Sequence, residues 1–449
     1  MKRQMAVMAA VLATAVGAMA GRVEAQATAE KFSFGLTLPG FTAVDAGARY
    51  APDKPGFEQA GGAFPKLDDD HFTADRPFFF SVTVPEGNYQ VTVRLGGSAA
   101  AQTTVKAELR RLMLDKIPTK AGESVSKTFA VSVRRPPIVD AEGKDLGMTK
   151  VKAREGRQGA LNRAAGGEGF SWDDALTLEF SGTPALQAIE IHKFTPARQV
   201  FLCGDSTMCD QPAEPYTSWG QMITRWFAPD TVVSNLAISG ETMPAFLGEN
   251  RLAKITSQLQ PGDFVLVQFG HNDMKSTAPD ALQTYKKNLL RFISETRAKG
   301  GVPVLLTPVS RESFVDGKIS NSFIVKHGGA AGDAPADDYL AAVKQVASEQ
   351  QVTLIDLNAS SAALYEAFGP EKAQVLFATP KEKTHHSDFG SYEIAKCVVQ
   401  GIVDAKLELA QHLSPDWKPF DPSKPDSEEA VDPVKDVLPG GRGAAPAGN

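Results

Sequence analysis

The sequence predicts an α/β protein in which an antiparallel β-sandwich precedes a three-layer domain with a doubly wound parallel sheet. Before about residue 197, short runs alternate polar and apolar residues with turns between them, which is typical of half-buried antiparallel strands. After that point, continuous apolar runs alternate with helical patterns, which is typical of parallel strands covered on both faces. The length of 449 residues allows two or three domains, and we place the two at 29–195 and 198–412.

Residues 1–25 stand apart from both domains. Lys2 and Arg3 precede an apolar stretch, Met5–Val16, and small residues with plausible cleavage signals follow it. This stretch is shorter than the roughly 18 residues that a membrane-spanning helix needs, so residues 1–25 are interpreted as a secretory signal peptide. We therefore expect a secreted or periplasmic protein with no membrane segment after signal cleavage.

The predicted sandwich is built from short runs joined by turns such as Pro85–Asn88. A stretch rich in Gly, Lys and Arg, Pro136–Gly169, interrupts this pattern and is expected to form a surface loop. The clearest strand-like runs are Lys31–Leu36, Phe78–Val84, Tyr89–Leu95, Thr103–Leu109, Ser126–Val133, Leu176–Phe180 and Ala188–His192.

Five apolar runs follow residue 197, most of them continuous, with helical patterns between them, and this alternation predicts the doubly wound sheet. The runs are Val200–Cys203, Thr231–Asn235, Phe264–Phe269, Val302–Leu306 and Val352–Asp356. The expected helices are Trp219–Phe227, Ala281–Lys299, Tyr339–Glu349 and a closing helix, Tyr392–Gln411. Residues 413–449 form a tail rich in Pro and Gly. Its first part is expected to pack on the surface, and its last dozen residues to be disordered.

The charge balance and the cysteine count argue against several classes of function. The formal net charge is −6 and no basic cluster could follow a phosphate backbone, so we expect no nucleic-acid partner. Three cysteines allow one disulfide at most, and no Cys/His spacing is typical of zinc. Cys203 ends an apolar run and is expected in the core, whereas Cys209 could pair in an oxidising compartment. The acidic run Asp68–His71 is expected to be solvated rather than metal-binding.

Polar residues follow the predicted parallel strands at the carboxyl edge of the sheet, where ligands bind in such folds. Ser206 comes three residues after the first strand, and His385 lies between the fifth strand and the closing helix. A serine hydroxyl is a poor nucleophile without a base, and histidine titrates near neutral pH. Ser206 and His385 are therefore a candidate nucleophile and base for ester hydrolysis.

Gly240 and Asn272 are candidate donors to a developing oxyanion. Gly240 follows the second strand, where a glycine lets backbone approach a ligand, and the side-chain amide of Asn272 follows the third. Taken alone, each is better explained by a turn, Gly240 between strand and helix and Asn272 at the start of the next segment.

Glu382 lies three residues before His385, so its carboxylate can hold the imidazole in the useful tautomer, unless it is merely a solvated acid. Asp388 is a rival partner for His385 but is expected to cap the following helix. His386 is expected to point elsewhere, and His271 to be structural because one base is enough.

Together these motifs resemble SGNH (GDSL-type) hydrolases, and more narrowly their rhamnogalacturonan acetylesterase-like branch. The resemblance covers about residues 200–412. It implies a flavodoxin-like α/β/α fold, no metal or other cofactor, and removal of acyl groups, often acetyl, from carbohydrate. It rests on Phe201–Thr207, Ser239–Thr242, Phe269–Asp273 and Thr384–Gly390.

The resemblance also implies site roles: Ser206 as nucleophile, His385 as base, and Gly240 and Asn272 completing the oxyanion hole. The family usually has Asp where this chain has Glu382. Either the longer side chain still reaches the histidine, or Ser206 and His385 work as a dyad. The stretch Ile324–Asp338 is longer than is usual in the family and is expected to form a rim loop that changes substrate access.

The first domain resembles galactose-binding-like sandwiches that precede the hydrolase domain in some bacterial members. Phe32–Gly35 and Trp172–Phe180 carry this resemblance. The sandwich either binds sugar or only packs against its neighbour. If it binds sugar, a chain of residues 198–449 should keep its rate on p-nitrophenyl acetate and lose activity on polysaccharide.

The resemblance implies a serine esterase that deacetylates plant cell-wall polysaccharide, with pectic rhamnogalacturonan as the expected substrate. The first alternative is an acetylxylan or small-ester esterase of the same mechanism. The second is a carbohydrate-binding protein whose hydrolase domain is inert, for which the departure at Glu382 is the supporting feature.

Overall fold

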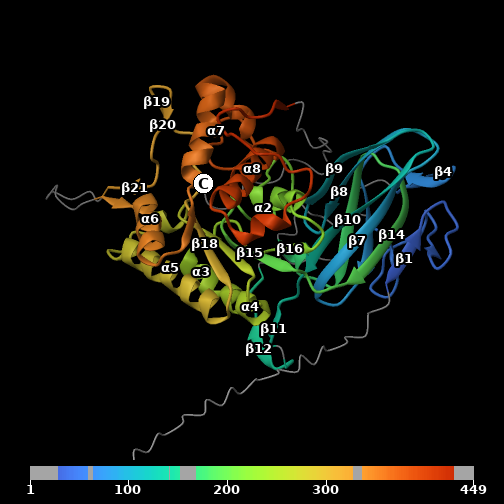
Figure 1. Ribbon diagram of the computed structural model, residues 1–449, viewed down its shortest axis with the longest axis horizontal. Helices are drawn as coiled ribbons and strands as arrows, with labels where there is room; N and C mark the ends of the chain where they lie inside the picture. The colour runs from blue at the N-terminus through green and yellow to red at the C-terminus, as the bar shows by residue number, and fades with distance from the viewer. Residues whose placement is uncertain (1–28, 59–63, 141, 152–167, 327–335, 429–449) are drawn as a thin grey trace, which may run out of the picture.

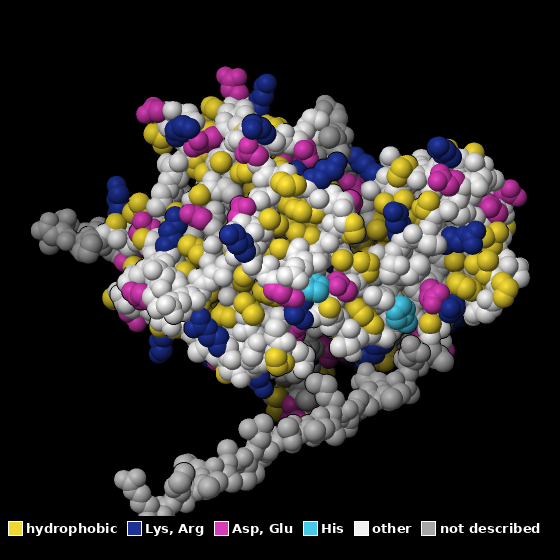
Figure 2. All heavy atoms as spheres, in the orientation of Figure 1, with side chains coloured by type: hydrophobic (Ala, Val, Ile, Leu, Met, Phe, Trp, Pro, Cys, Tyr) yellow, Lys and Arg dark blue, Asp and Glu magenta, His cyan; other side chains and the backbone are white. Residues whose placement is uncertain are grey.

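The computed structural model describes residues 29–58, 64–140, 142–151, 168–326 and 336–428, so the expected signal peptide and the end of the tail lie outside it. A strand-rich N-terminal region stands beside a sheet covered by helices (Figure 1). Positive and negative side chains are interspersed over the face drawn in Figure 2. Within the described ranges, no helix is long and apolar enough to span a membrane.

The N-terminal region consists of two sheets that enclose one hydrophobic cluster, as the alternating runs predict. Aromatic side chains fill it: the Phe34 ring lies 5.2 Å from Phe80 and 6.0 Å from Phe57 between centroids. One sheet has the order β10 (Ser124–Val133), β7 (Gly87–Gly96), β14 (Leu186–Lys193), β1 (Glu30–Ser33) and β2 (Thr42–Ala43), with β5 (His71–Thr73) on β14 and β4 (Lys66–Asp68) on β5. The other has the order β3 (Gly56–Phe57), β6 (Phe78–Thr83), β13 (Ala175–Thr183), β8 (Ala101–Ala107) and β9 (Arg111–Thr119).

The second region is a three-layer α/β/α structure around a parallel sheet of flavodoxin-like strand order, 2-1-3-4-5, which confirms the predicted fold. The strands are β16 (Thr231–Asn235), β15 (Arg198–Gly204), β17 (Phe264–Gln268), β18 (Val302–Leu306) and β23 (Thr353–Ile355). In this order β16 is added on one side of β15 and the later strands on the other, so the strand order reverses between β15 and β17. Ligands bind outside the carboxyl ends of the strands at such a point.

Alternate residues of the central strands face two separate hydrophobic clusters. Val200 and Leu202 of β15 join the cluster shared by α2 (Trp219–Met222), α7 (Leu357–Lys372) and α8 (Asp388–Asp404). Phe201 and Cys203 join the cluster shared by α3 (Met243–Gly248), α4 (Arg251–Gln258), α5 (Ala281–Ala298) and α6 (Tyr339–Glu349). Burial on both faces explains why these runs are continuously apolar. Cys203 is a buried free thiol as expected, and Cys209 is also free.

Several elements depart from the sequence prediction. Part of the expected loop Pro136–Gly169 forms a hairpin, β11 (Pro137–Val139) with β12 (Asp145–Met148), and 152–167 lie outside the described residues. The expected helix Trp219–Phe227 changes after α2 into a 3-10 turn, η2 (Ile223–Trp226). The closing helix begins at Asp388 and ends before a separate turn, η5 (Glu408–His412). The remaining short elements are η1 (Glu168–Ser171), η3 (Asp273–Lys275), η4 (Ala373–Leu376), β19 (Phe314–Val315), β20 (Lys318–Ile319), β21 (Ile324–Val325) and β22 (Asp337–Asp338).

Strand β9 is not predicted from the sequence because it lies between the two regions and has no polar face there. Leu112 belongs to the hydrophobic cluster of α2, α7 and α8, whereas its neighbours Met113 and Leu114 belong to the cluster between the two N-terminal sheets. Three consecutive buried residues do not alternate, so the pattern of a half-buried strand is lost. The N-terminal region thus supplies part of the core of the parallel-sheet region.

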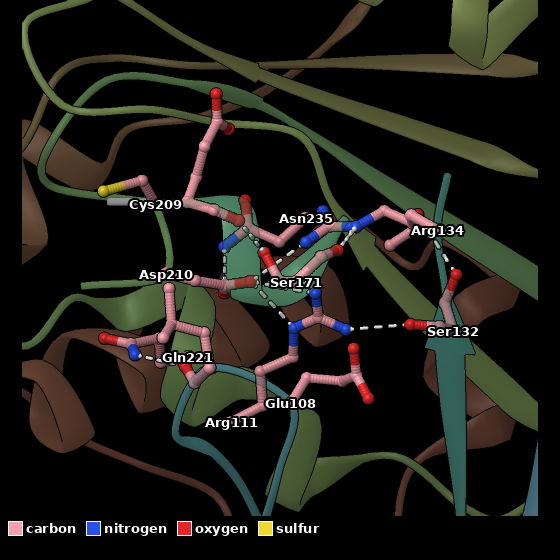
Figure 3. Close-up of polar contacts among 12 residues, drawn as sticks. Glu108, Arg111, Ser132, Arg134, Ser171, Cys209, Asp210, Gln221 and Asn235 are labelled. Atoms are coloured by element: carbon pink, nitrogen blue, oxygen red, sulfur yellow. Dashed lines mark hydrogen bonds and ion pairs between the residues drawn. The ribbon is translucent and has the colours of Figure 1, made fainter. Parts of the chain in front are cut away.

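A buried ion-pair network also joins the two regions (Figure 3). Arg111, at the start of β9, places Nη2 2.8 Å and Nε 2.9 Å from Asp210 Oδ2. Arg134 reaches the same oxygen at 3.2 Å, and Asn235 donates to the other oxygen at 2.8 Å. Both arginines are buried, and removing one partner of a buried pair leaves an uncompensated charge at a cost of about 3–5 kcal/mol.

The beginning of the tail packs against the parallel-sheet region. Trp417 lies 5.2 Å from Trp226 between ring centroids, and Phe420 is buried in the cluster of α2, α7 and α8. The tail to residue 428 thus extends the core beyond the closing helix, whereas 429–449 lie outside the described residues.

Candidate active site

Ser206 lies on a tight loop at the carboxyl end of β15. The loop is closed by its own hydrogen bonds: Asp205 Oδ1 accepts from Thr207 N at 3.0 Å and from Thr207 Oγ1 at 2.9 Å. A Cβ atom on Gly204 would lie 2.7 Å from Met208 Sδ, so only glycine lets the strand turn here without a shift. The loop therefore fixes Ser206 at the carboxyl edge of the sheet, where the strand order reverses.

His385 is in direct contact with Ser206. Its Nε2 lies 2.8 Å from Ser206 Oγ, within hydrogen-bond distance, and both side chains are buried. Ser206 and His385 are 179 residues apart in the chain, and the fold brings them together at the carboxyl edge of the sheet. This is the contact that a serine nucleophile and its base require.

Glu382 lies beside the other nitrogen of the same ring. Its Oε1 is 3.5 Å from His385 Nδ1, longer than a normal hydrogen bond but within ion-pair distance. The same oxygen accepts from the backbone N–H groups of Lys383 at 2.9 Å, Thr384 at 2.9 Å and His385 at 3.2 Å. Glu382 is therefore not a solvated acid: it is buried, it shapes the loop and it faces the imidazole.

Asp388 faces away from this arrangement. Its Oδ1 contacts Thr217 Oγ1 and lies 3.3 Å from Arg110 Nη2, so it is engaged by the N-terminal region. The expectation that it caps α8 is wrong, because Ser387 is the N-cap and accepts from Gly390 N through its hydroxyl at 3.1 Å. Asp388 is the first helical residue, where its charge still favours the helix N-terminus.

The two neighbouring histidines are structural, as the sequence predicts. His386 Nε2 lies 2.6 Å from the Tyr365 hydroxyl, and burial lowers the pKa of His386 to about 3, aided by repulsion from His385. His271 Nδ1 lies 3.1 Å from Asp205 Oδ2 and its Nε2 lies 3.0 Å from Val309 O. Burial lowers the pKa of His271, although the Asp205 carboxylate opposes that shift. Both ring nitrogens of His271 are thus occupied in bracing the Ser206 loop.

The two candidate oxyanion donors lie on adjoining loops. Gly240 has φ +78°, a left-handed conformation that favours glycine and turns the backbone after β16. Asn272 follows β17, and its Nδ2 donates to Glu241 O at 3.0 Å, which uses one of the two amide hydrogens. The loop that carries Gly240 is thereby joined to the loop that carries Asn272.

Gln211 links these loops to the serine and has no signal in the sequence. Its Nε2 donates to Ser206 O at 2.7 Å, and its Oε1 accepts from Ser239 Oγ at 3.4 Å. Tyr216 was also missed: its ring stands edge-on to His385, with 6.1 Å between centroids. Neither residue belongs to a recognisable motif, so only the folded structure places them.

Asp273 ties the third motif to the helix that follows Gly240. Its Oδ1 accepts from Met243 N, the first residue of α3, at 2.9 Å. Burial raises the pKa of the Asp273 carboxyl to about 7, and the nearby Asp205 charge adds to the shift. The carboxyl is thus poised to change its protonation state near neutral pH.

Comparison with known proteins identifies the family. The sequence pattern of the GDSL-like lipase/acylhydrolase family matches residues 202–388. The rhamnogalacturonan acetylesterase RhgT of Bacillus subtilis (strain 168) is 36% identical over 230 residues, which cover 48% of this chain and 94% of RhgT. This chain belongs to the GDSL-like lipase/acylhydrolase family. It is a carboxylic ester hydrolase, and the resemblance of its motifs is confirmed.

Another similar protein extends across most of this GDSL-like hydrolase. The esterase YxiM of the same organism, described as uncharacterized, is 26% identical over 391 residues, which cover 83% of this chain and 89% of YxiM. The crystal structure of YxiM covers 85% of this chain and 99% of its own, at 23% identity and a TM-score of 0.45.

Proposed function

We propose that this hydrolase removes acetyl groups from carbohydrate, with Ser206 as nucleophile, His385 as general base and Glu382 orienting the base. The observation that carries the proposal is the 2.8 Å contact between Ser206 Oγ and His385 Nε2 at the switch point of the sheet. A buried hydroxyl hydrogen-bonded to imidazole is the arrangement that activates serine for acyl transfer.

In the first half of the reaction, Ser206 Oγ attacks the acetyl carbonyl while its proton passes to His385 Nε2. The negative charge that develops on the carbonyl oxygen is stabilised by the N–H groups of Ser206 and Gly240 and by the Asn272 amide. Glu382 stabilises the imidazolium through Nδ1. The tetrahedral intermediate then collapses as His385 returns the proton to the departing sugar oxygen.

The second half regenerates the enzyme. His385 takes one proton from water as the water oxygen attacks the acetyl carbonyl on Ser206, and the bond to Ser206 Oγ then breaks as His385 returns that proton to Oγ. The product leaves as acetic acid and ionises to acetate in the solvent. Every proton transfer to or from Ser206 passes through His385.

Acetylated rhamnogalacturonan is the substrate that we propose. Support comes from RhgT, named a rhamnogalacturonan acetylesterase, since this chain is 36% identical to it over 230 residues and the match covers 94% of RhgT. Acetate release measured on acetylated rhamnogalacturonan and acetylated xylan at equal acetyl content tests this choice. Faster release from xylan would overturn the substrate and leave the mechanism intact.

Ser206→Ala tests the mechanism directly. The variant should lose about 10⁴-fold or more in kcat on p-nitrophenyl acetate while the melting temperature stays near that of the native protein, because one oxygen atom is removed without new contacts. Asn272→Ala should lose about 10²–10³-fold, the usual effect of one oxyanion donor. Near-native turnover by Ser206→Ala would end the proposal.

A further inference from the structure

The turn between β8 and β9 carries an arginine of the N-terminal region into the surroundings of the catalytic loops. Arg110 is 5% exposed and has φ +61°, a left-handed conformation that residues other than glycine rarely adopt. From this geometry, and resting on the function proposed above, we propose that Arg110 is a positioning residue: it holds the loops carrying Ser206 and His385 in their reactive arrangement.

The Arg110 guanidinium bridges two segments of the esterase region, residues 211–217 and the start of α8. Nη1 donates to Tyr216 O at 2.9 Å and to Gln211 O at 3.3 Å. Nη2 lies 3.3 Å from both Thr217 Oγ1 and Asp388 Oδ1, and it pairs with Glu214. A planar group with five N–H donors suits such convergent acceptors, which a single ammonium matches less well.

On the nucleophile side, the link runs through Gln211. Arg110 binds its backbone carbonyl, and the Gln211 side chain donates to Ser206 O at 2.7 Å. The backbone carbonyl of Gln211 also accepts from Gln221 Nε2 at 3.0 Å, so this residue is held from two sides. A shift of Gln211 would move the support beneath Ser206.

On the histidine side, two links reach the loop of His385. Tyr216, held through its carbonyl, presents its ring edge to His385, and Thr217 N donates to His386 O at 3.1 Å. Asp388 anchors the start of α8 three residues beyond His385. Arg110 therefore fixes both ends of the catalytic contact through other residues: its hydrogen bonds and ion pairs go to residues 211–217 and to Asp388.

A matched control lies at the amino edge of the parallel sheet, opposite the carboxyl edge that holds Ser206. Gln90 Nε2 donates to Pro229 O at 2.8 Å, also across the boundary between the two regions, beside the start of β16. Gln90→Ala removes an interregional hydrogen bond far from the carboxyl edge. This variant shows whether activity is lost because the contact between the two regions is weakened in general or because the loops of Ser206 and His385 are displaced.

The experiment compares full-length Arg110→Ala, Arg110→Lys and Gln90→Ala with the native protein on p-nitrophenyl acetate, with melting temperatures recorded in parallel. Arg110→Ala should lower kcat by about 10²-fold with little change in KM, the size of effect expected when a catalytic contact is displaced by about 1 Å. Arg110→Lys, which keeps the charge and stem, should fold and recover part of kcat. Gln90→Ala should keep native kcat.

Native kcat in Arg110→Ala, or in Arg110→Lys if the alanine variant does not fold, would overturn the positioning role. So would equal losses of kcat in Arg110→Ala and Gln90→Ala. Ser206→Ala measured alongside keeps this outcome apart from failure of the proposed function. If Ser206→Ala is inactive and the Arg110 variants have native kcat, only the positioning role of Arg110 is wrong. If Ser206→Ala is active, the proposed mechanism is wrong.

Discussion

The Glu382 carboxylate has two kinds of partner. It accepts three backbone N–H groups that fold its own loop, and it lies 3.5 Å from His385 Nδ1. The sequence left open whether a glutamate could reach the histidine where the family usually has Asp. The structure places its oxygen beside the ring, at a distance that can shorten when the imidazole becomes charged.

Glu382→Gln separates these two partners, because glutamine keeps an acceptor oxygen for the loop and loses the charge that orients and stabilises the imidazolium. We expect kcat on p-nitrophenyl acetate to fall by about 10²–10⁴-fold with little change in KM or melting temperature. Glu382→Asp, which keeps the charge, should retain much of the activity. An unchanged kcat in Glu382→Gln would show that Ser206 and His385 act as a dyad.

Asp273 makes stability depend on pH. Its pKa rises from 3.8 to about 7 on folding, and its buried Oδ2 has no hydrogen-bond partner among the described residues. Between about pH 4 and 7 the folded protein therefore holds a proton that the unfolded chain has released, so stability from this group falls as pH rises through that window. Asp273→Asn should raise the melting temperature relative to the native protein progressively from pH 4 to 8. Parallel curves for the two proteins would contradict this.

At the residue scale, the sequence predicts the site residues that lie in motifs or one turn from them. Ser206, His385 and Glu382 follow strands or lie one turn apart, so strand order and local spacing suffice to bring them together. Arg110 and Gln211 are 101 residues apart in the chain, and each donates to a backbone carbonyl: Arg110 to that of Gln211, and Gln211 to that of Ser206. Sequence periodicity does not predict such contacts.

At the scale of elements, the buried strands were the most predictable parts. Thr231–Asn235 and Val302–Leu306 were predicted with their observed bounds. Burial on both faces gives Val302–Leu306 an uninterrupted apolar run. Helix α7 was missed because its buried stripe contains Ser361 beside Leu364 and Tyr365, and a small polar residue weakens the helical period.

Helix α2 packs so closely on the Ser206 loop that one glycine decides the fit. A Cβ atom on Gly220 would lie 2.0 Å from Met208 O and 2.8 Å from Asn235 Nδ2. Gly220→Ala should therefore push α2 away from the loop and lower both the melting temperature and kcat. Gly248 in α3 has open space around its Cβ position, so Gly248→Ala should leave kcat unchanged and keep or raise the melting temperature. Equal behaviour of the two variants would rule out this close approach as the cause.

At the scale of the whole molecule, the N-terminal region contributes to the core of the esterase region and to the supports of its active site. Leu112 belongs to the esterase core, Arg111 is fully buried against Asp210, and Arg110 reaches the supports of Ser206 and His385. The sequence allows the sandwich to be either a sugar-binding module or a packing partner. The pattern of β9 does not show that its residues belong to two hydrophobic cores.

A chain of residues 198–449 tests this dependence. The sequence suggested that such a chain would keep its rate on p-nitrophenyl acetate, since a small ester does not reach a neighbouring domain.

The structure changes that expectation. Truncation removes Leu112 from the core, leaves Asp210 without Arg111 and Arg134, and takes away the guanidinium that binds Gln211 and Tyr216. We expect the shortened chain to be much less stable, and any folded fraction to lose activity on p-nitrophenyl acetate and on acetylated rhamnogalacturonan to the same degree.

The test compares both rates per folded molecule, with folding followed by circular dichroism. A stable shortened chain that keeps its rate on the small ester and loses it on the polysaccharide would mean that the sandwich acts by holding substrate rather than by completing the esterase.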